Sequence, residues 1–214
     1  MKNIITLISI IISIFLLTNK PFNNKSFIKI NDNNNNLKEK INYLKETYNK
    51  DIIGIINNKI ITVQTIDNNY YLTHDLNNNY SKYGTVFMDY RNNITDDILI
   101  FYGHNSKLID TDFHFLENYL NKDYFTNNKY ITLQTESFFR KYQIFSVILT
   151  TNNTHTKLGF TNSNNYLNHL NELKKNSIYS ISSNLEVNSK IIILQTCNMQ
   201  KKGEYIIVAA YQNE

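Results

Sequence analysis

Ile191-Ile-Ile-Leu-Gln-Thr-Cys197 is an apolar run that ends on the one cysteine of the chain. A second run, Ile98-Leu-Ile-Phe-Tyr-Gly-His104, ends in the same way on a histidine. Their length and their β-branched and aromatic content are typical of buried strands. A polar stretch, residues 198–203, follows the cysteine, so we expect the sulfur near a strand end beside a surface loop.

Two interpretations of this cysteine are open. As a residue type, a lone cysteine after an apolar stretch is usually a small buried hydrophobe. In contrast, two strands that each deliver one member of a Cys–His pair favour a nucleophile and its base, as in cysteine acyl transfer. The chain also begins like an exported protein. A single cysteine then has no internal disulfide partner, so its thiol is either intermolecular or free to react.

The N-terminus predicts a membrane anchor. Lys2 precedes an apolar segment, residues 4–17, which is shorter than the about 20 residues that span a bilayer comfortably, so a cleaved signal peptide and an uncleaved anchor compete. We favour a signal anchor over residues 1–18, because no small-x-small cleavage site follows it. Lys2 would keep the N-terminus in the cytoplasm. The linker at residues 19–36 and the domain at residues 37–214 would then lie outside the cell membrane.

The composition allows one domain of ordinary size and argues against nucleic acid as a partner. The chain has 214 residues, 42% of them hydrophobic, and a net charge of +4. Its lysines are scattered, whereas phosphate recognition needs clustered basic side chains. The sequence has no ligand set with recognisable metal spacing, so neither a metal nor a cofactor is expected.

Short β-rich runs alternate with Asn- and Asp-rich turns along most of the chain. The predicted strands are residues 52–56, 60–66, 70–72, 85–88, 98–102, 130–133, 142–150, 191–196 and 204–211. Apolar residues spaced three and four apart predict helices at 37–50 and 166–175, and helical turns within 108–120. The fold class is therefore mostly β, a sheet or barrel with two or three peripheral helices.

Five blocks of the sequence follow one another in a specific order and spacing. They are Asn69-Tyr-Tyr-Leu-Thr-His-Asp75, Gly84-Thr-Val-Phe-Met-Asp-Tyr-Arg-Asn92, Ile100-Phe-Tyr-Gly-His-Asn105, Tyr142-Gln-Ile-Phe-Ser-Val147 and Leu194-Gln-Thr-Cys197. Together they resemble the class B sortases, over roughly residues 38–211.

This resemblance implies a closed eight-stranded sortase-like β-barrel and a cysteine transpeptidase on the surface of a Gram-positive cell. Such enzymes cleave a C-terminal sorting signal after threonine through a thioester. They pass the surface protein to an amine, usually of peptidoglycan and in some cases of a pilin. By position, the resemblance makes Cys197 the nucleophile and His104 the proton-transfer residue, and Thr196 matches the residue before the nucleophile.

The resemblance also implies an arginine at the start of the last strand, just before an aromatic residue, where it would bind the substrate and the oxyanion. Glu204-Tyr205 stands there instead. A carboxylate cannot donate a hydrogen bond to an oxyanion and would repel a thiolate. Either the alignment slips locally, a lysine substitutes for the arginine, or activity is weak. As a substitute Lys202 is preferred over Lys201, because in an extended strand it would share a face with Glu204. Both lysines can equally be solvated loop residues. The alternative function is therefore a weakly active or inactive sortase-like binding module at the cell surface.

Arg91 and the histidines other than His104 have structural interpretations. Arg91 is expected to pair with Asp89 or with a carbonyl rather than enter the site, although its length allows it to reach the site. His74 is expected to be a hydrogen-bonding structural residue. The other histidines lie in helical or loop contexts and are expected at the surface: His114, His155 and His169.

Overall fold

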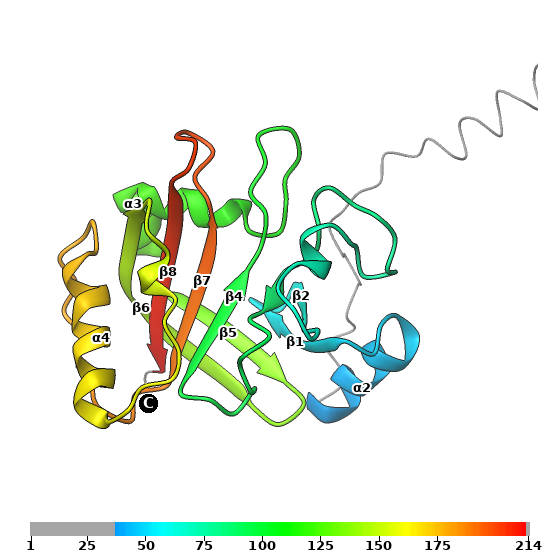
Figure 1. Ribbon diagram of the computed structural model, residues 1–214, viewed down its shortest axis with the longest axis horizontal. Helices are drawn as coiled ribbons and strands as arrows, with labels where there is room; N and C mark the ends of the chain where they lie inside the picture. The colour runs from blue at the N-terminus through cyan, green and yellow to red at the C-terminus, as the bar shows by residue number, and fades with distance from the viewer. Residues whose placement is uncertain (1–36, 213–214) are drawn as a thin grey trace, which may run out of the picture.

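Eight strands close into one barrel in the computed structural model, which describes residues 37–212 (Figure 1). The strands are β1 (Ile52–Ile56), β2 (Ile60–Val63), β3 (Phe87–Met88), β4 (Ile98–Tyr102), β5 (Tyr130–Thr135), β6 (Phe139–Thr150), β7 (Ile191–Cys197) and β8 (Tyr205–Gln212). Around the barrel they follow the order β1-β2-β3-β4-β7-β8-β6-β5. The predicted closed eight-stranded barrel is therefore confirmed.

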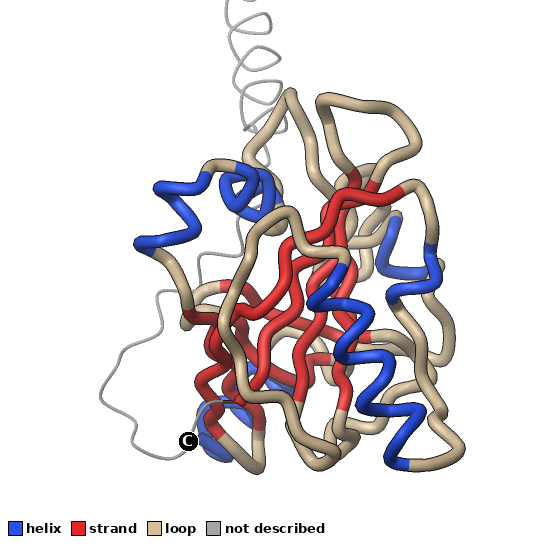
Figure 2. The backbone as a smooth tube through the Cα atoms, turned by 90° about the vertical axis from the view of Figure 1, so that its left-hand side faces the viewer, coloured by secondary structure: helices blue, strands red, loops and turns tan. Residues whose placement is uncertain are grey.

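The helical elements lie outside this barrel or over its end. They are α2 (Leu37–Thr47), η1 (Tyr70–Leu72), η2 (His114–Leu120), α3 (Lys122–Asn127), η3 (Asn153–His155) and α4 (Ser163–Lys175), where η denotes a 3-10 helix. Figure 2 shows α4 running along the outer face of the strands. The helices predicted at residues 37–50 and 166–175 are confirmed as α2 and α4. α2 ends three residues earlier than expected, and α4 begins three residues earlier.

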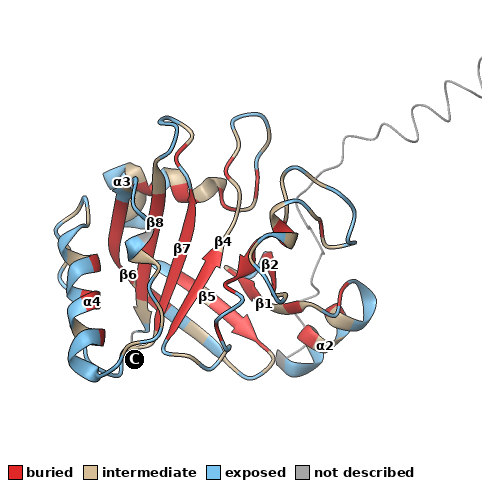
Figure 3. Ribbon diagram, in the orientation of Figure 1, coloured by how far each residue is buried: buried red, intermediate tan, exposed pale blue. Residues whose placement is uncertain are grey.

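The two apolar runs ending at His104 and Cys197 contain neighbouring parallel strands. β4 pairs with β7 from Ile98↔Ile191 to Tyr102↔Gln195. Parallel strands are usually covered on both faces, which explains why these runs are apolar throughout rather than alternating. Figure 3 shows both strands buried along nearly their whole length.

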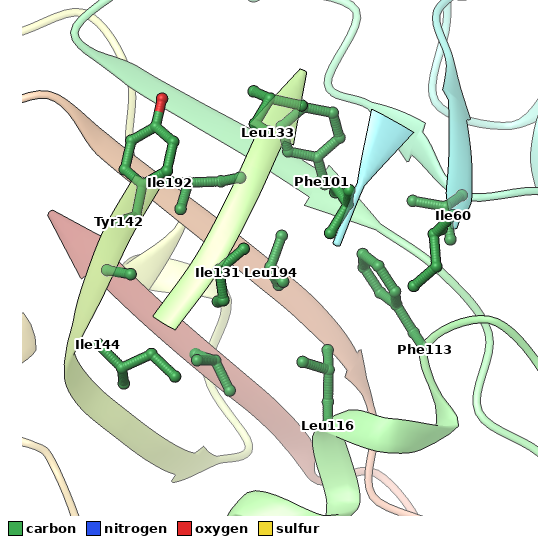
Figure 4. Packing of buried hydrophobic residues seen from close by; sticks show 14 of the residues in the cluster. Ile60, Phe101, Phe113, Leu116, Ile131, Leu133, Tyr142, Ile144, Ile192 and Leu194 are labelled. Atoms are coloured by element: carbon green, nitrogen blue, oxygen red, sulfur yellow. The ribbon is translucent and has the colours of Figure 1, made fainter. Parts of the chain in front are cut away.

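Side chains of these strands alternate between the barrel interior and an outer layer under α4. Leu99, Phe101, Ile192 and Leu194 belong to the interior core, together with Leu116 of η2. Figure 4 shows the packing of this cluster, with all of these except Leu99 labelled. The outer layer consists of the alternate residues and the apolar face of α4: Ile98, Ile100, Ile191, Ile193, Leu170 and Leu173. The β4–β7 pair therefore joins two cores, which fixes its position.

Two local predictions differ from the structure. Residues 70–72 form the short helix η1 and not a strand, because the Asp67 carboxylate accepts hydrogen bonds from the backbone N–H groups of Asn69 and Tyr70 and closes a turn. The helix α3 was not predicted. It begins where the Asn121 side chain accepts the N–H groups of Asp123 and Tyr124, which is an N-cap.

The predicted anchor at residues 1–18 and linker at residues 19–36 lie outside the described residues. Within residues 37–212, none of the helices has both the length and the apolar character needed to cross a bilayer.

Replacing Leu194 by alanine tests the interior core. Leu194 is fully buried at 0% exposure, so Leu194→Ala is expected to lower the free energy of unfolding by about 2–5 kcal/mol in denaturant titrations. The matched control is Leu108→Ala, at a leucine that is 82% exposed, where a change within about 0.5 kcal/mol is expected. Equal losses in the two variants would contradict the core assignment.

Candidate active site

The ends of β4 and β7 stay together beyond their last ladder pair. The N–H of Gly103 donates to the carbonyl of Gln195 at 3.3 Å, and the Thr196 hydroxyl donates to the carbonyl of Gly103 at 2.6 Å. The Asn105 side chain then donates to the carbonyl of Cys197 at 3.1 Å. These three bonds hold the segment that carries His104 beside the segment that carries Cys197.

Gly103 allows the β4 end to lie this close to the core. A Cβ atom at this position would approach the Phe113 ring to 2.8 Å and a Val86 methyl group to 2.9 Å. Both distances are too short for real carbon atoms, so a larger residue would displace the segment that carries His104. Close packing against Phe113 and Val86 therefore explains why a glycine stands before His104.

His104 and Cys197 line one cavity of about 480 Å³ on the outer face of the barrel. Tyr102 and Gln195, the last ladder pair, lie along the same cavity, and Arg91 and Tyr205 contribute to its wall. The structure thus brings together the two residues that sequence reasoning paired, from segments far apart in the chain.

A backbone carbonyl orients the His104 ring. Nε2 of His104 lies 2.8 Å from the carbonyl oxygen of Leu72, at the end of η1. Since a carbonyl only accepts, Nε2 carries the proton, and in the neutral ring Nδ1 is left as the acceptor. The segment that was wrongly predicted as a strand therefore sets the tautomer of this histidine.

The thiol of Cys197 is exposed at the end of β7, although protein surrounds one side of it. This partial burial raises the pKa of the thiol above its ordinary value. The resting site therefore favours the neutral thiol, and a thiolate has to form by proton transfer to a base.

Asp89 and Arg91 form the pair that was predicted for them. Nε and Nη2 of Arg91 donate to the two oxygens of Asp89 at 2.9 and 2.7 Å, and the Tyr102 hydroxyl donates to Asp89 Oδ2 at 3.0 Å. Burial by itself would raise the pKa of Asp89, but the hydrogen bonds from Arg91 and Tyr102 lower it overall. The Arg91 side chain, 46% exposed, still lines the cavity. The pairing with Asp89 was therefore predicted correctly. The Arg91 side chain is also long enough to line the cavity while it is paired.

Glu204 does not face the thiol. Its carboxylate accepts hydrogen bonds from Asn198 Nδ2 at 2.6 Å and from Lys201 Nζ at 3.1 Å, and these two bonds lower its pKa. The alternation of β8 explains this, because Ile206 belongs to the barrel interior and Ile207 to the outer layer. Tyr205, and not Glu204, therefore shares the outer face with Cys197.

The extended strand assumed for Lys202 is wrong. Residues 201–203 form a turn in which Gly203 has a φ of 80°, and β8 begins only at Tyr205. Lys202 is exposed and does not line the cavity, while Lys201 pairs with Glu204. Neither lysine faces Cys197, so the interpretation as loop residues describes them better.

Sequence reasoning missed a polar network behind the nucleophile. Nδ1 of His114 lies 2.6 Å from Asn105 Oδ1, and Asn105 Nδ2 donates to Glu117 as well as to the Cys197 carbonyl. His114, which was expected at the surface, is half-buried and is held by its bond to Asn105. The available signal was an asparagine directly after His104.

His169 was also predicted wrongly. It lies on the buried face of α4 and is 4% exposed, and this burial lowers its pKa to about 4. His74 agrees with its structural interpretation, since its ring stacks on Tyr70 and its Nδ1 lies 2.8 Å from the Tyr70 carbonyl. Within residues 37–212, His, Cys, Asp and Glu side chains form no group of three or more that would hold a metal ion.

Known proteins are similar to this chain in sequence. Sortase B of Listeria monocytogenes is 33% identical over 172 residues, which is 74% of this chain and 69% of the relative. Sortase B of Staphylococcus aureus is 30% identical over 162 residues, 71% of this chain and 65% of the relative. None of the protein-family models matches the chain.

Solved structures share the fold. A mutant form of Clostridium perfringens sortase B superimposes with a TM-score of 0.77 at 30% identity, covering 82% of this chain and 87% of that one. A Staphylococcus aureus sortase B–substrate complex has a TM-score of 0.76 at 27% identity, covering 83% and 86%. A closed barrel with Cys197 and His104 in one cavity, together with these similarities, defines a cysteine transpeptidase of the sortase type. The chain belongs to the sortase B family.

The raised pKa of Cys197 predicts slow alkylation at neutral pH. The rate constant of Cys197 with iodoacetamide at pH 7 is expected to be lower in the folded protein than in the protein unfolded in guanidinium. In the unfolded chain the thiol has its ordinary pKa of about 8.5. As the pH increases, the alkylation rate of the folded protein is expected to rise with an apparent pKa higher than that of the unfolded protein. A folded-state titration midpoint below that of the unfolded chain would contradict this result.

Proposed function

We propose that this sortase B-family protein cleaves a sorting signal after threonine and transfers the surface protein to an amine of peptidoglycan or of a pilin. The observation that carries the proposal is the joint position of Cys197 and His104 in one cavity, on strand ends tied together by hydrogen bonds. Family membership supports the reaction class.

In the first half-reaction, Nδ1 of His104 accepts the thiol proton and the sulfur of Cys197 attacks the threonine carbonyl carbon. The imidazolium is stabilised where Nε2–H donates to the Leu72 carbonyl. His104 then returns the proton to the leaving amine, the peptide C–N bond breaks and a thioester remains on Cys197.

In the second half-reaction, the acceptor amine attacks the thioester while His104 removes its proton. The C–S bond breaks, the new amide forms and the thiolate recovers the proton. Water in place of the amine would release a free acid by the same route. Since burial raises the pKa of the Cys197 thiol, the thiol is favoured over the thiolate until a base takes its proton.

The cavity supplies the binding site in this proposal. It extends along the outer face from His104 and Cys197 past the Tyr102–Gln195 pair to Arg91. A relative of the same fold is known as a complex with its substrate, which supports placing the sorting peptide on the corresponding face of this chain. The protein would act outside the cell membrane, held by an anchor at residues 1–18.

The alternative of an inactive binding module rested on Glu204. That carboxylate is engaged with Asn198 and Lys201 and does not line the cavity. Its expected repulsion of a thiolate therefore gives no reason to prefer a binding module.

Mass spectrometry of the full-length protein with a set of threonine-containing sorting peptides tests the reaction. The wild type is expected to gain a peptide acyl group on Cys197, and Cys197→Ala is expected to gain none. His104→Asn is expected to lower kcat/KM by about 100-fold or more, because the proton-transfer group is lost.

The matched control for this experiment is His74→Asn, at a histidine that stacks on Tyr70 and does not line the cavity. Its kcat/KM is expected to stay within about two-fold of the wild type, as for a substitution outside the site. Turnover by Cys197→Ala would rule out the thioester mechanism.

A further inference from the structure

Acyl transfer at Cys197 requires a hydrogen-bond donor for the oxyanion. Attack by the sulfur places a negative charge on the former carbonyl oxygen, and a preorganised donor at that point commonly supplies a large part of the rate enhancement. The lysines nominated from sequence do not face the thiol, since Lys201 binds Glu204 and Lys202 lies in a turn outside the cavity. The donor has to come from the residues that line the cavity.

Tyr205 lies directly across from Cys197. The two residues are Cα partners at the end of the antiparallel β7–β8 ladder. Opposite residues of such a ladder project from the same face, with Cβ atoms about 4.5–5.5 Å apart. Both line the cavity, and the bond from Asn198 N–H to the Glu204 carbonyl at 2.8 Å holds the register next to them.

The Tyr205 hydroxyl is available to donate a hydrogen bond. Among residues 37–212 it has no hydrogen-bond partner. Tyr102 in the same cavity differs, because its hydroxyl donates to Asp89. Half-burial restricts the Tyr205 ring, and its free hydroxyl can turn toward an oxygen bound at the thiol.

Two other donors beside Cys197 are already engaged. The backbone N–H after the nucleophile, that of Asn198, donates to the Glu204 carbonyl, and the Thr196 hydroxyl donates to the Gly103 carbonyl. Arg91 donates from Nε and Nη2 to Asp89, which also binds Tyr102, the last residue of β4. Arg91 also lines the cavity, but this pairing engages two of its three guanidinium nitrogens.

We propose that the Tyr205 hydroxyl donates the hydrogen bond that stabilises the oxyanion during acyl transfer at Cys197. Tyr205 is thereby a catalytic residue of this chain, at the strand position that faces the nucleophile. The inference rests on the proposed function. A phenol brings no positive charge to the thiol, so it assists the tetrahedral intermediate without promoting thiolate formation.

The test compares wild type with Tyr205→Phe, both full-length, using a sorting peptide that acylates the wild type. Removing only the hydroxyl is expected to lower kcat by about 100- to 1000-fold, with KM nearly unchanged. The iodoacetamide rate at Cys197 is expected to stay within about two-fold, because alkylation forms no oxyanion. Tyr43→Phe is the matched control, at a tyrosine that is 59% exposed, and is expected to keep the wild-type kcat.

Tyr205→Arg provides a second, independent measurement. It returns a donor to the same position, so its kcat is expected to exceed that of Tyr205→Phe by about ten-fold or more. An equally low kcat in both variants would count against a donor role for this position.

The outcomes separate this inference from the proposed function. Wild-type protein that forms no acyl adduct with any sorting peptide removes both. An active wild type with equally active Tyr205→Phe removes the tyrosine's role and leaves the transpeptidase proposal standing. Loss of kcat in Arg91→Gln alongside active Tyr205→Phe would assign the oxyanion to the guanidinium and overturn the inference.

Discussion

The parallel pairing of β4 with β7 is the constraint on which the rest of the structure depends. These strands separate the barrel interior from the layer under α4, so their side chains are buried on both faces. A shift of register by one residue would exchange the two faces and expose apolar side chains. The register is therefore strongly specified, and it places His104 next to Cys197 where the ladder ends.

The chemistry sits where this pairing stops. Each strand leaves the core at its end, so the next side chains become accessible while their backbones remain held by Gly103, Thr196 and Asn105. The Leu72 carbonyl orients the imidazole, and partial burial keeps the thiol protonated at rest. The scaffold thus holds the thiol and the imidazole, the two groups that the proposed mechanism uses, in one cavity.

Much of the fold was predictable because its signals are local. Continuous apolar runs identified β4 and β7, and apolar spacing of three and four identified α2 and α4. The errors occurred where a side chain closes a turn, as Asp67 does at η1 and Asn121 at α3. Such turns depend on a single side chain and leave no periodic pattern. The order of the five sequence blocks indicated the family, which the 33% identity to Listeria monocytogenes sortase B then established.

By itself, the sequence determined the strand content, the family and the two candidate catalytic residues, because these depend on residue type, run length and order along the chain. Only the tertiary structure decided which residues face the thiol. The turn at residues 201–203 and the alternation of β8 direct Glu204 away from Cys197 and bring Tyr205 opposite it. Facing across a sheet depends on the register between strands, and register is set by packing and turn geometry rather than by the residues of one strand.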